Sequence, residues 1–398
     1  MSQRLRHDSA SGRQAYNGGT ETLMMSIKRL FNKVFPRIKP ISIDECKNIY
    51  ASAIFDKQTF YMPAMHEISM QCHEDIFSYS VDVPSYNIYS LKNGKCIVGK
   101  EEIYTKNNRV IKEITSQKTN PKIGLSSRFL RKYKHIRGKV LCLSQTGLVN
   151  NYYHFNVELL GRFYIFLKSN LEYDYITFPE NNNFQREFRT LLGIDKNKIL
   201  DERKYNVIRA DELIFTDLLN NWRLEYFRGY SFPSKEYVPS WLSGIYKYIK
   251  KRNKMQERNY QRLYISRSKA EYRRVVNEDK LLEVLYRYGF HCLYLEELTV
   301  IDQIEIFSSA ELIIAPHGAG LVNISYCNKK ATILELYPQF YHDPGIRVQA
   351  TMLGHDYQFH VGKSEEITNI NPRKEDVVVD VEKIEKWLIE RCLTTAAT

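Results

Sequence analysis

One group of residues able to do chemistry forms a turn with two glycines: Pro316, His317, Gly318, Ala319 and Gly320. Short apolar runs flank this turn at 312–315 and 331–336, and residues 321–327 have helical spacing. The order predicts a buried strand, a glycine turn, a short helix and a second buried strand. Glycines let the backbone approach a ligand, and the first N–H groups of a helix face an anion. The turn is therefore predicted to hold the phosphate end of an activated donor, with His317 donating to a phosphate oxygen or to a backbone carbonyl.

Polar side chains at neighbouring strand ends would join this turn. Arg267 follows a predicted strand at 262–266, where its guanidinium could bind a diphosphate bidentately, and Arg274 comes shortly after it. Glu335 lies near the end of the strand after the turn, where a carboxylate could accept hydrogen bonds from a ribose. Asn323 would lie on the first turn of the short helix, as a cap or as a ligand contact. The alternatives are a solvated loop charge for either arginine and a structural ion pair for Glu335.

A second candidate group lies in the run NYYHFNVE at 151–158. His154 and Glu158 are four residues apart, so they share one face of a helix. Either Glu158, or His154 oriented by it, could deprotonate an acceptor hydroxyl. A buried polar pair that stabilises the helix is the more common explanation of an isolated His-x-x-x-Glu, and both readings stay open.

The C-terminal half of the sequence predicts a regular scaffold for these residues. Predicted strands at 262–266, 291–295, 312–315 and 331–336 alternate with predicted helices at 277–288, 300–309 and 321–327. Such alternation specifies a parallel, doubly wound sheet. Ligands of such sheets bind at the carboxyl ends of the strands, where the turn and Arg267 are expected.

The N-terminal half predicts an α/β domain with additional β structure. Residues 40–150 alternate between apolar and polar as strands do, with breakers between the runs. Helices are predicted at 151–167 and at 183–192, the latter closed by Gly193, and strands at 173–178, 198–200 and 212–215.

The predicted layout has five parts: a disordered leader at 1–24, a basic amphipathic helix at 25–39, an N-terminal α/β domain at 40–232, a C-terminal Rossmann-like domain at 233–370 and a segment at 371–398 whose helix packs back on the N-terminal domain. The boundary follows the aperiodic stretch 223–239, which is marked by Gly229 and Pro233. The basic helix has its apolar face within Ser26 to Phe35 and could lie on an anionic membrane surface or dock on its own domain.

Composition limits the classes of function. The 398 residues carry a net charge of +12, with 43% hydrophobic and 26% charged residues, as expected for a soluble globular protein of two domains. The charge favours nucleic acid, an anionic membrane or phosphorylated substrates as partners, but zinc-finger and RNA-recognition motifs are missing, so nucleic acid is not expected. Seven cysteines without a CxxC pair suit free thiols in a reducing compartment. The sequence has neither a signal peptide nor an apolar run of about 18 residues, so we expect a cytoplasmic location.

Several motifs are absent from the sequence. There is no HExxH and no DxD triplet, with which metal-dependent sugar-nucleotide enzymes commonly hold a divalent cation. GxxxxGK[ST], GxSxG and GxGxxG are also missing, which argues against a P-loop nucleotidase, a serine hydrolase and a nicotinamide enzyme. We therefore predict no metal site and no cofactor.

Together these motifs resemble glycosyltransferase family 61. The resemblance is carried by LYISR at 263–267, NE at 277–278, LE at 295–296, HGAGLVN at 317–323 and EL at 335–336. The run NYYH at 151–154, followed by Glu158, is similar to the acceptor-side motif of the same family, in which Asp is frequent at the position of Glu158. The matched blocks span residues 145–360, and the first 140 residues show no resemblance.

The resemblance implies a GT-B-like fold, with two Rossmann-like domains facing a cleft and the donor nucleotide on the C-terminal domain. It also implies inverting, metal-independent transfer from a nucleotide sugar, with Glu158 as the base and His154 as its support. The implied donor-binding residues are Arg267, Arg274, His317, Gly318, Ala319, Gly320, Asn323 and Glu335. The implied acceptor-side residues are Asn151 and Tyr153.

The resemblance further implies a bacterial-type member that builds capsule, lipopolysaccharide or another surface glycan. Its expected partners are a nucleotide-sugar donor and a glycan or lipid-linked glycan acceptor, met at the inner face of the membrane. Two alternatives stay open: a nucleotide-sugar epimerase on the same two-domain plan, and a non-enzymatic protein that binds polyanions.

Overall fold

The computed structural model describes residues 39–63, 67–68, 79–100, 102–114, 129–143, 147–201, 203–219, 237–364 and 371–395. The predicted leader at 1–24 and the basic helix at 25–39, except its last residue, lie outside these ranges. Most of the predicted boundary stretch 223–239 lies outside them as well. Every structural statement below concerns the described residues.

The C-terminal sheet has five strands in the order β13–β12–β14–β15–β16, and all neighbouring pairs are parallel. The strands are β12 (Arg262–Ile265), β13 (His291–Leu293), β14 (Leu312–Pro316), β15 (Thr332–Tyr337) and β16 (Asp356–Val361). The chain moves outward in one direction from β12 to β13 and in the other from β14 to β16. The strand order therefore reverses between β12 and β14, which is the point where ligands of doubly wound sheets bind. The predicted doubly wound parallel sheet is confirmed.

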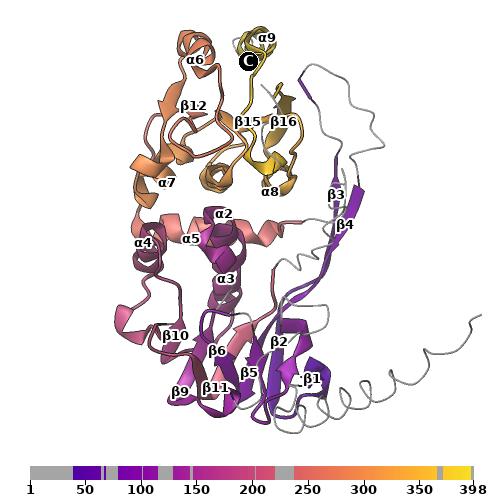
Figure 1. Ribbon diagram of the computed structural model, residues 1–398, viewed down its shortest axis with the longest axis vertical. Coiled ribbons are helices and arrows are strands. Elements are labelled where there is room, and N and C mark those ends of the chain that lie inside the picture. Colours follow the sequence, from indigo (N-terminus) through magenta and orange to yellow (C-terminus); the bar gives the residue numbers. More distant parts are fainter. Residues whose placement is uncertain are drawn as a thin grey trace, which may run out of the picture.

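Helices complete this part of the molecule: α6 (Glu278–Arg287), α7 (Val300–Ser308), the 3-10 helix η10 (Ala319–Tyr326), α8 (Gly345–Leu353) and α9 (Val381–Thr395). Figure 1 shows α6 and α9 side by side at the upper end. The apolar face of α9, with Ile384 and Leu388, packs on Leu281 and Leu285 of α6. The last helix therefore packs on the C-terminal sheet rather than on the N-terminal domain, where we expected it.

The N-terminal sheet has nine strands and mixed direction. Three neighbouring strands run parallel: β10 (Tyr175–Thr177), β9 (Lys134–Cys142) and β11 (Val207–Thr216). Beyond β11 the sheet continues antiparallel through β5 (Tyr86–Lys92) and β6 (Lys95–Ile97), and its outer strands are β1 (Pro40–Ile41), β2 (Ile49–Phe55), β7 (Ile103–Tyr104) and β8 (Val110–Ile111). A separate ribbon pairs β3 (Gln58–Met62) with β4 (Tyr79–Val83). The prediction of α/β structure with additional strands is confirmed.

Helices of the N-terminal part lie between the two sheets (Figure 1). The predicted helix at 151–167 consists of α2 (Tyr152–His154), one π-helical turn at Phe155–Leu159 and α3 (Leu160–Lys168). Helix α4 (Asn183–Leu192) has the predicted bounds, because a capping box of Asn182 and Gln185 marks its start and Gly193, at φ 70°, ends it. Helix α5 (Ser243–Asn253) follows the boundary stretch.

A continuous apolar core joins the two sheets through α5. One buried cluster contains Phe155, Ile245 of α5, Ile304 of α7 and Val322 of η10. Within it, Tyr246 donates to the backbone oxygen of Asn156 at 3.2 Å, and Tyr326 donates to Asn156 Oδ1 at 3.1 Å. The two sheets are thus fixed against each other by packing and by buried hydrogen bonds.

Some elements differ from the sequence prediction. The predicted strand at 198–200 is a 3-10 turn at Lys196–Lys198 followed by a single bridge between Ile176 and Ile199. Helix α8 and strand β16 were not predicted, because 338–344 carries turn residues and β16 alternates only weakly. Strand β16 matters for the site, since it covers the outer edge of β15.

Candidate functional site

A cavity of about 850 Å³ opens at the carboxyl ends of β12 and β14. We call it the switch-point cavity. Its lining includes Ser266, Arg267, Pro316, Gly318, Gly320 and Leu321 from the C-terminal sheet, Tyr152, Asn182, Asn183, Arg186 and Glu187 from the N-terminal part, and Thr299, Val300 and Gln303 from α7 and its cap. Both parts of the protein thus contribute to one cavity, the N-terminal part through α2 and α4, at the position where the strand order predicts a ligand.

Arg267 and Gly318 face each other in this cavity. A Cβ atom on Gly318 would lie 2.5 Å from Arg267 Nη1, so only glycine leaves room for the guanidinium there. Arg267 Nη2 donates to the backbone oxygen of Tyr272 at 3.1 Å, whereas its buried Nε has no partner among the described residues. Burial, and next the nearby Arg273, lower the pKa of Arg267 to about 10. The side chain is therefore a charged group at pH 7, and no carboxylate in the described ranges forms an ion pair with it.

His317 and Glu335 form a buried pair behind the glycine turn. His317 Nδ1 lies 2.6 Å from Glu335 Oε1, and Glu335 is fully buried. Tyr337 and Tyr357 donate to Glu335 Oε2 at 2.9 and 2.6 Å. Burial, followed by the Glu335 charge, raises the pKa of both tyrosines well above their usual range. The carboxylate orients His317 and does not line the cavity, so its predicted contact with a ribose has no geometric support here and stays a prediction.

Asn323 and Gly320 both contact residues that line the cavity, and Gly320 also lines it. Asn323 is fully buried, donates to Gln303 Oε1 at 2.7 Å and accepts from Tyr152 Oη at 3.0 Å. A Cβ atom on Gly320 would lie 2.6 Å from Leu295 Cδ1, so the glycine permits close packing of η10 against this loop. Asn323 therefore links the two parts of the protein instead of capping η10.

Arg274 does not line the cavity. Its Nε and Nη2 donate to Asp376 Oδ2 at 2.9 and 2.6 Å, and its backbone N–H donates to Asp376 Oδ1 at 2.8 Å. The half-exposed side chain therefore holds the segment that leads to α9. This geometry gives its predicted contact with the donor no support, and Arg274 is not part of the donor site proposed below.

The predicted pair of His154 and Glu158 is formed. His154 Nδ1 lies 2.7 Å from Glu158 Oε1, and Glu158 is almost completely buried. Asn151 caps the turn by accepting from the N–H groups of Tyr153 and His154 at 2.9 and 3.3 Å. The pair lies where the helix widens into a π turn, a feature frequent at functional sites.

The same turn touches the C-terminal part on two sides. Tyr152 lines the switch-point cavity, and Tyr153 Oη donates to the backbone oxygen of Gly345 at 3.3 Å. His154 and Glu158 are thus in the turn next to the cavity but not in its lining. Their geometry suits a proton acceptor and a structural polar pair equally.

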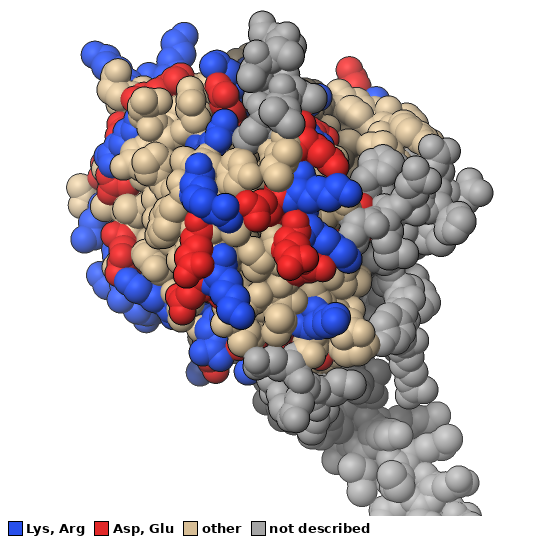
Figure 2. Space-filling view, turned by 90° about the horizontal axis from the view of Figure 1, so that it is seen from above, with Lys and Arg blue, Asp and Glu red and all other residues tan. Residues whose placement is uncertain are grey.

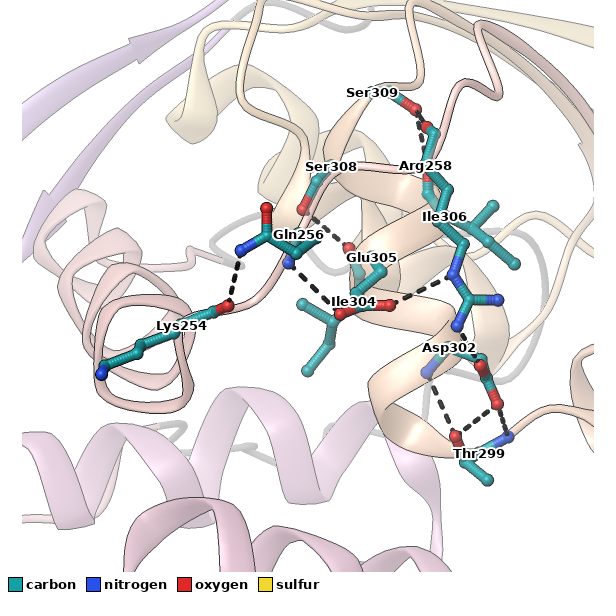
Figure 3. Close-up of polar contacts among 10 residues, drawn as sticks. All are labelled: Lys254, Gln256, Arg258, Thr299, Asp302, Ile304, Glu305, Ile306, Ser308 and Ser309. Carbon is teal, nitrogen blue, oxygen red and sulfur yellow. Dashed lines mark hydrogen bonds and ion pairs between the residues drawn. The ribbon is translucent and has the colours of Figure 1, made fainter.

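The contributions of α7 and α4 to the cavity were not predicted from the sequence. Figure 3 shows Arg258 in contact with two carboxylates of α7. Its Nε donates to Glu305 Oε2 at 3.1 Å, and its guanidinium also binds Asp302. Asp302 and Thr299 form the capping box at the start of α7. At the start of α7, the Val300 N–H donates to Glu187 Oε2 of α4 at 2.7 Å. The Thr-x-x-Asp capping signal was readable in the sequence, but the contact with α4 depends on the tertiary fold.

The outer face over α6 and α9 carries mixed charges. Figure 2 shows basic and acidic side chains interspersed on this face. Ion pairs there join Arg287 to Glu385 at 2.9 Å and Lys383 to Asp380 at 3.7 Å. This face therefore offers no continuous positive field for a polyanion.

Two further observations concern the described residues alone. None of their helices combines the length and the apolar character needed to cross a membrane. No group of three or more His, Cys, Asp or Glu side chains within the described ranges is arranged to hold a metal ion.

Comparison with known proteins identifies relatives of this part of the chain. Residues 152–334 match the family model described as Glycosyltransferase 61. The EGF domain-specific O-linked N-acetylglucosamine transferase of Drosophila melanogaster is 36% identical over 87 residues, which cover 20% of this chain. The match covers 16% of the length of that relative.

Proposed function

Because the chain belongs to the glycosyltransferase 61 family through residues 152–334, we propose that it transfers a sugar from a nucleotide-sugar donor to a hydroxyl group of a glycan. The observation that carries the proposal is the guanidinium of Arg267, which lies over Gly318 without an ion-pair partner among the described residues. A cavity of about 850 Å³ is large enough for a nucleotide sugar.

Donor binding would use the glycine turn and Arg267. The guanidinium donates to the diphosphate, and the N–H groups at the start of η10 face the same charge. His317, held by Glu335, would donate its Nε2–H to a phosphate oxygen in its protonated form. We give Glu335 this positioning role instead of the ribose contact, because its Oε2 already accepts from both tyrosines and its Oε1 lies against His317 Nδ1.

In the proposed reaction, the acceptor oxygen attacks the anomeric carbon in line while the bond from that carbon to the diphosphate oxygen breaks. Glu158, oriented by His154, takes the acceptor proton. Arg267 stabilises the negative charge that grows on the leaving diphosphate. Attack opposite the leaving group inverts the anomeric centre. No metal has a role in this scheme, so transfer is expected to continue in a chelator such as EDTA.

The two sheets would act as a GT-B-like pair, with the donor on the C-terminal sheet and the acceptor approaching from the side of α2. Support comes from the lining of the switch-point cavity, to which both parts contribute. Asn151 and Tyr153 would shape the acceptor side, since they fix the turn that carries His154.

The acceptor is proposed to be a surface glycan of capsule or lipopolysaccharide type, reached from the cytoplasmic face of the membrane. This part rests on the sequence, including the basic helix predicted at 25–39. The name of the Drosophila relative points to EGF domains as the acceptor of that protein. Incubation with labelled donor and either a lipid-linked oligosaccharide or a folded EGF domain separates the two: label on the EGF domain alone would refute the surface-glycan acceptor.

The donor assignment is tested by thermal shift with a panel of UDP-, GDP-, CMP- and dTDP-sugars, because a ligand that binds only the folded state raises its melting temperature. We expect one nucleotide class to stabilise the wild type and the Arg274→Gln variant but not Arg267→Gln. Arg274 is the matched control, since it is an arginine of the same loop outside the cavity. An unchanged shift in Arg267→Gln would remove the proposed diphosphate site.

Two alternative functions make different predictions. An epimerase would convert the donor without any acceptor, so a donor-only incubation analysed for sugar isomers detects it. A polyanion-binding protein would bind nucleic acid with steep salt dependence. The mixed charges on the face over α6 and α9 give that alternative no support.

A further inference from the structure

A second group of cations lies beside Arg267, outside the switch-point cavity. We call it the tyrosine–cation cluster: Tyr272, Arg273, Tyr341, Arg373 and Lys374. The Cζ atom of Arg273 lies 5.1 Å from the Tyr272 ring centre and 5.7 Å from that of Tyr341. Lys374 Nζ lies 5.7 Å from the Tyr272 ring centre, and Arg373 Cζ lies 5.9 Å from that of Tyr341. Three positive charges thus surround two tyrosine rings.

The nearby carboxylates do not neutralise Arg273. Asp376 is taken by Arg274, and Asp343 accepts from Tyr341 Oη at 3.1 Å and from the Gly345 N–H at 2.9 Å. Within the described ranges Arg273 has no ion pair, and its buried Nε has no hydrogen-bond partner. The backbone of Arg273 is left-handed, at φ 59°, a conformation that costs energy for a residue other than glycine. A half-buried cation without an ion-pair partner among the described residues, in a strained backbone, is explained most simply by an anion that binds there.

The cluster lies between the proposed donor site and the proposed base. Arg267 shares the ring of Tyr272 with Arg273, its Cζ atom lying 5.9 Å from the ring centre. The ring of Tyr341 lies edge-on to His317, with centres 5.4 Å apart. Through Asp343, Tyr341 is linked to Gly345, whose carbonyl accepts from Tyr153, the neighbour of His154. An acceptor sugar that reaches His154 and Glu158 would therefore pass this cluster.

We propose that the tyrosine–cation cluster binds a negatively charged substituent, a phosphate or a carboxylate, on the acceptor glycan. The inference rests on the proposed function and names the substrate class of the same site: an acidic glycan rather than a neutral one. The tyrosine faces pack against the sugar ring, and Arg273 pairs with its anionic group. Arg267 stays with the donor diphosphate.

The test is calorimetric titration of the full chain, saturated with the nucleoside diphosphate that binds it, with matched disaccharides. One arm compares a uronate disaccharide with its neutral counterpart, and the other compares a phosphorylated disaccharide with the same sugar without phosphate. We expect at least one acidic probe to bind about tenfold or more tightly than its neutral partner. The two arms tell which anion the cluster prefers.

The variants are Arg273→Asn and Lys374→Gln, with Lys383→Gln as the control. Asparagine tolerates the left-handed backbone, Lys374 is exposed, and Lys383 lies on α9 with the same charge. Arg273→Asn should abolish the preference for acidic sugars, and its nucleotide affinity should stay within about twofold of the wild type. Lys374→Gln should weaken the preference for acidic sugars. The control Lys383→Gln should keep the preference of the wild type.

Equal binding of acidic and neutral probes by the wild type would overturn the proposal, and so would a parallel loss of nucleotide affinity in Arg273→Asn. Absence of nucleotide binding in the wild type would instead refute the proposed function. In that case titration of the acidic probes without nucleotide still tests the cluster by itself.

Discussion

The Gly318→Ala substitution separates the role of the glycine turn in folding from its role in binding. The new Cβ would lie 2.5 Å from Arg267 Nη1, 3.2 Å from Cζ and 3.5 Å from Cδ. The backbone itself accepts alanine, since φ is 176°, which is extended. The atom that must move is the end of a flexible side chain, so we expect a cost in folding free energy of only about 0.5–1.5 kcal/mol, from a changed arginine rotamer.

Donor binding should suffer more than stability. A guanidinium displaced from the cavity loses its charge-assisted hydrogen bonds to the diphosphate, worth about 1.5–3 kcal/mol, or about 10- to 100-fold in affinity. Titration of the nucleoside diphosphate, together with urea unfolding of the free protein, measures both quantities. Gly318→Ala should resemble Arg267→Gln in nucleotide affinity and the wild type in unfolding.

Gly244→Ala is the matched control. A Cβ at that position would lie 2.0 Å from Tyr164 Oη, again the end of a side chain, but in α5 and outside the cavity lining. Its nucleotide affinity should equal that of the wild type. Wild-type nucleotide affinity in Gly318→Ala would refute the idea that position 318 is glycine because a side chain there would displace the Arg267 guanidinium.

Three further predictions concern catalysis, pH dependence and stability. Glu158→Gln should abolish sugar transfer with a nucleotide-induced thermal shift equal to that of the wild type; near-normal turnover would sink its assignment as the base. The pKa of Arg267 is lowered from its usual value to about 10, chiefly by burial and next by Arg273, against smaller opposing effects of Tyr272, Glu296 and Asp376. Its charged form is therefore lost at a lower pH in the folded protein than in the unfolded chain. Between the two pKa values, this residue makes folding more favourable as the pH rises. Nucleotide binding should weaken as the pH approaches 10, because the guanidinium loses its charge. Titrations between about pH 8 and 10 should reveal that decline in the wild type, and an equal decline in Arg267→Gln would assign it to another group. Tyr326→Phe removes a donor to the buried Asn156 Oδ1, so urea unfolding should give a loss of about 1–3 kcal/mol, whereas Tyr61→Phe at an exposed tyrosine should change nothing.

Local signals in the sequence predicted most elements that position the site. Helix α4 has a capping residue at its start and Gly193 at its end, so both bounds follow from adjacent residues. Strands β12, β14 and β15 follow from short apolar runs, and the glycine turn from its position between two of them. The π turn at Phe155–Leu159 had no such signal, because apolar spacing cannot distinguish it from a continuous α-helix.

The roles of individual side chains depend on distant partners, which the sequence does not reveal. Arg267 and Arg274 looked alike in the sequence, yet Arg274 forms an ion pair with Asp376, 102 residues further along. Arg267 instead contacts the backbone and the ring of Tyr272 and the open side of Gly318, with no ion pair among the described residues. The carboxylate of Glu335 could have faced a ligand had β15 been the edge of its sheet. Strand β16 pairs with it and brings Tyr357 to the carboxylate, so Glu335 lies behind His317 in the interior. A charged residue at a strand end therefore predicts a ligand contact only where no later strand covers it, and this condition is met by Arg267 at the switch point between β12 and β14.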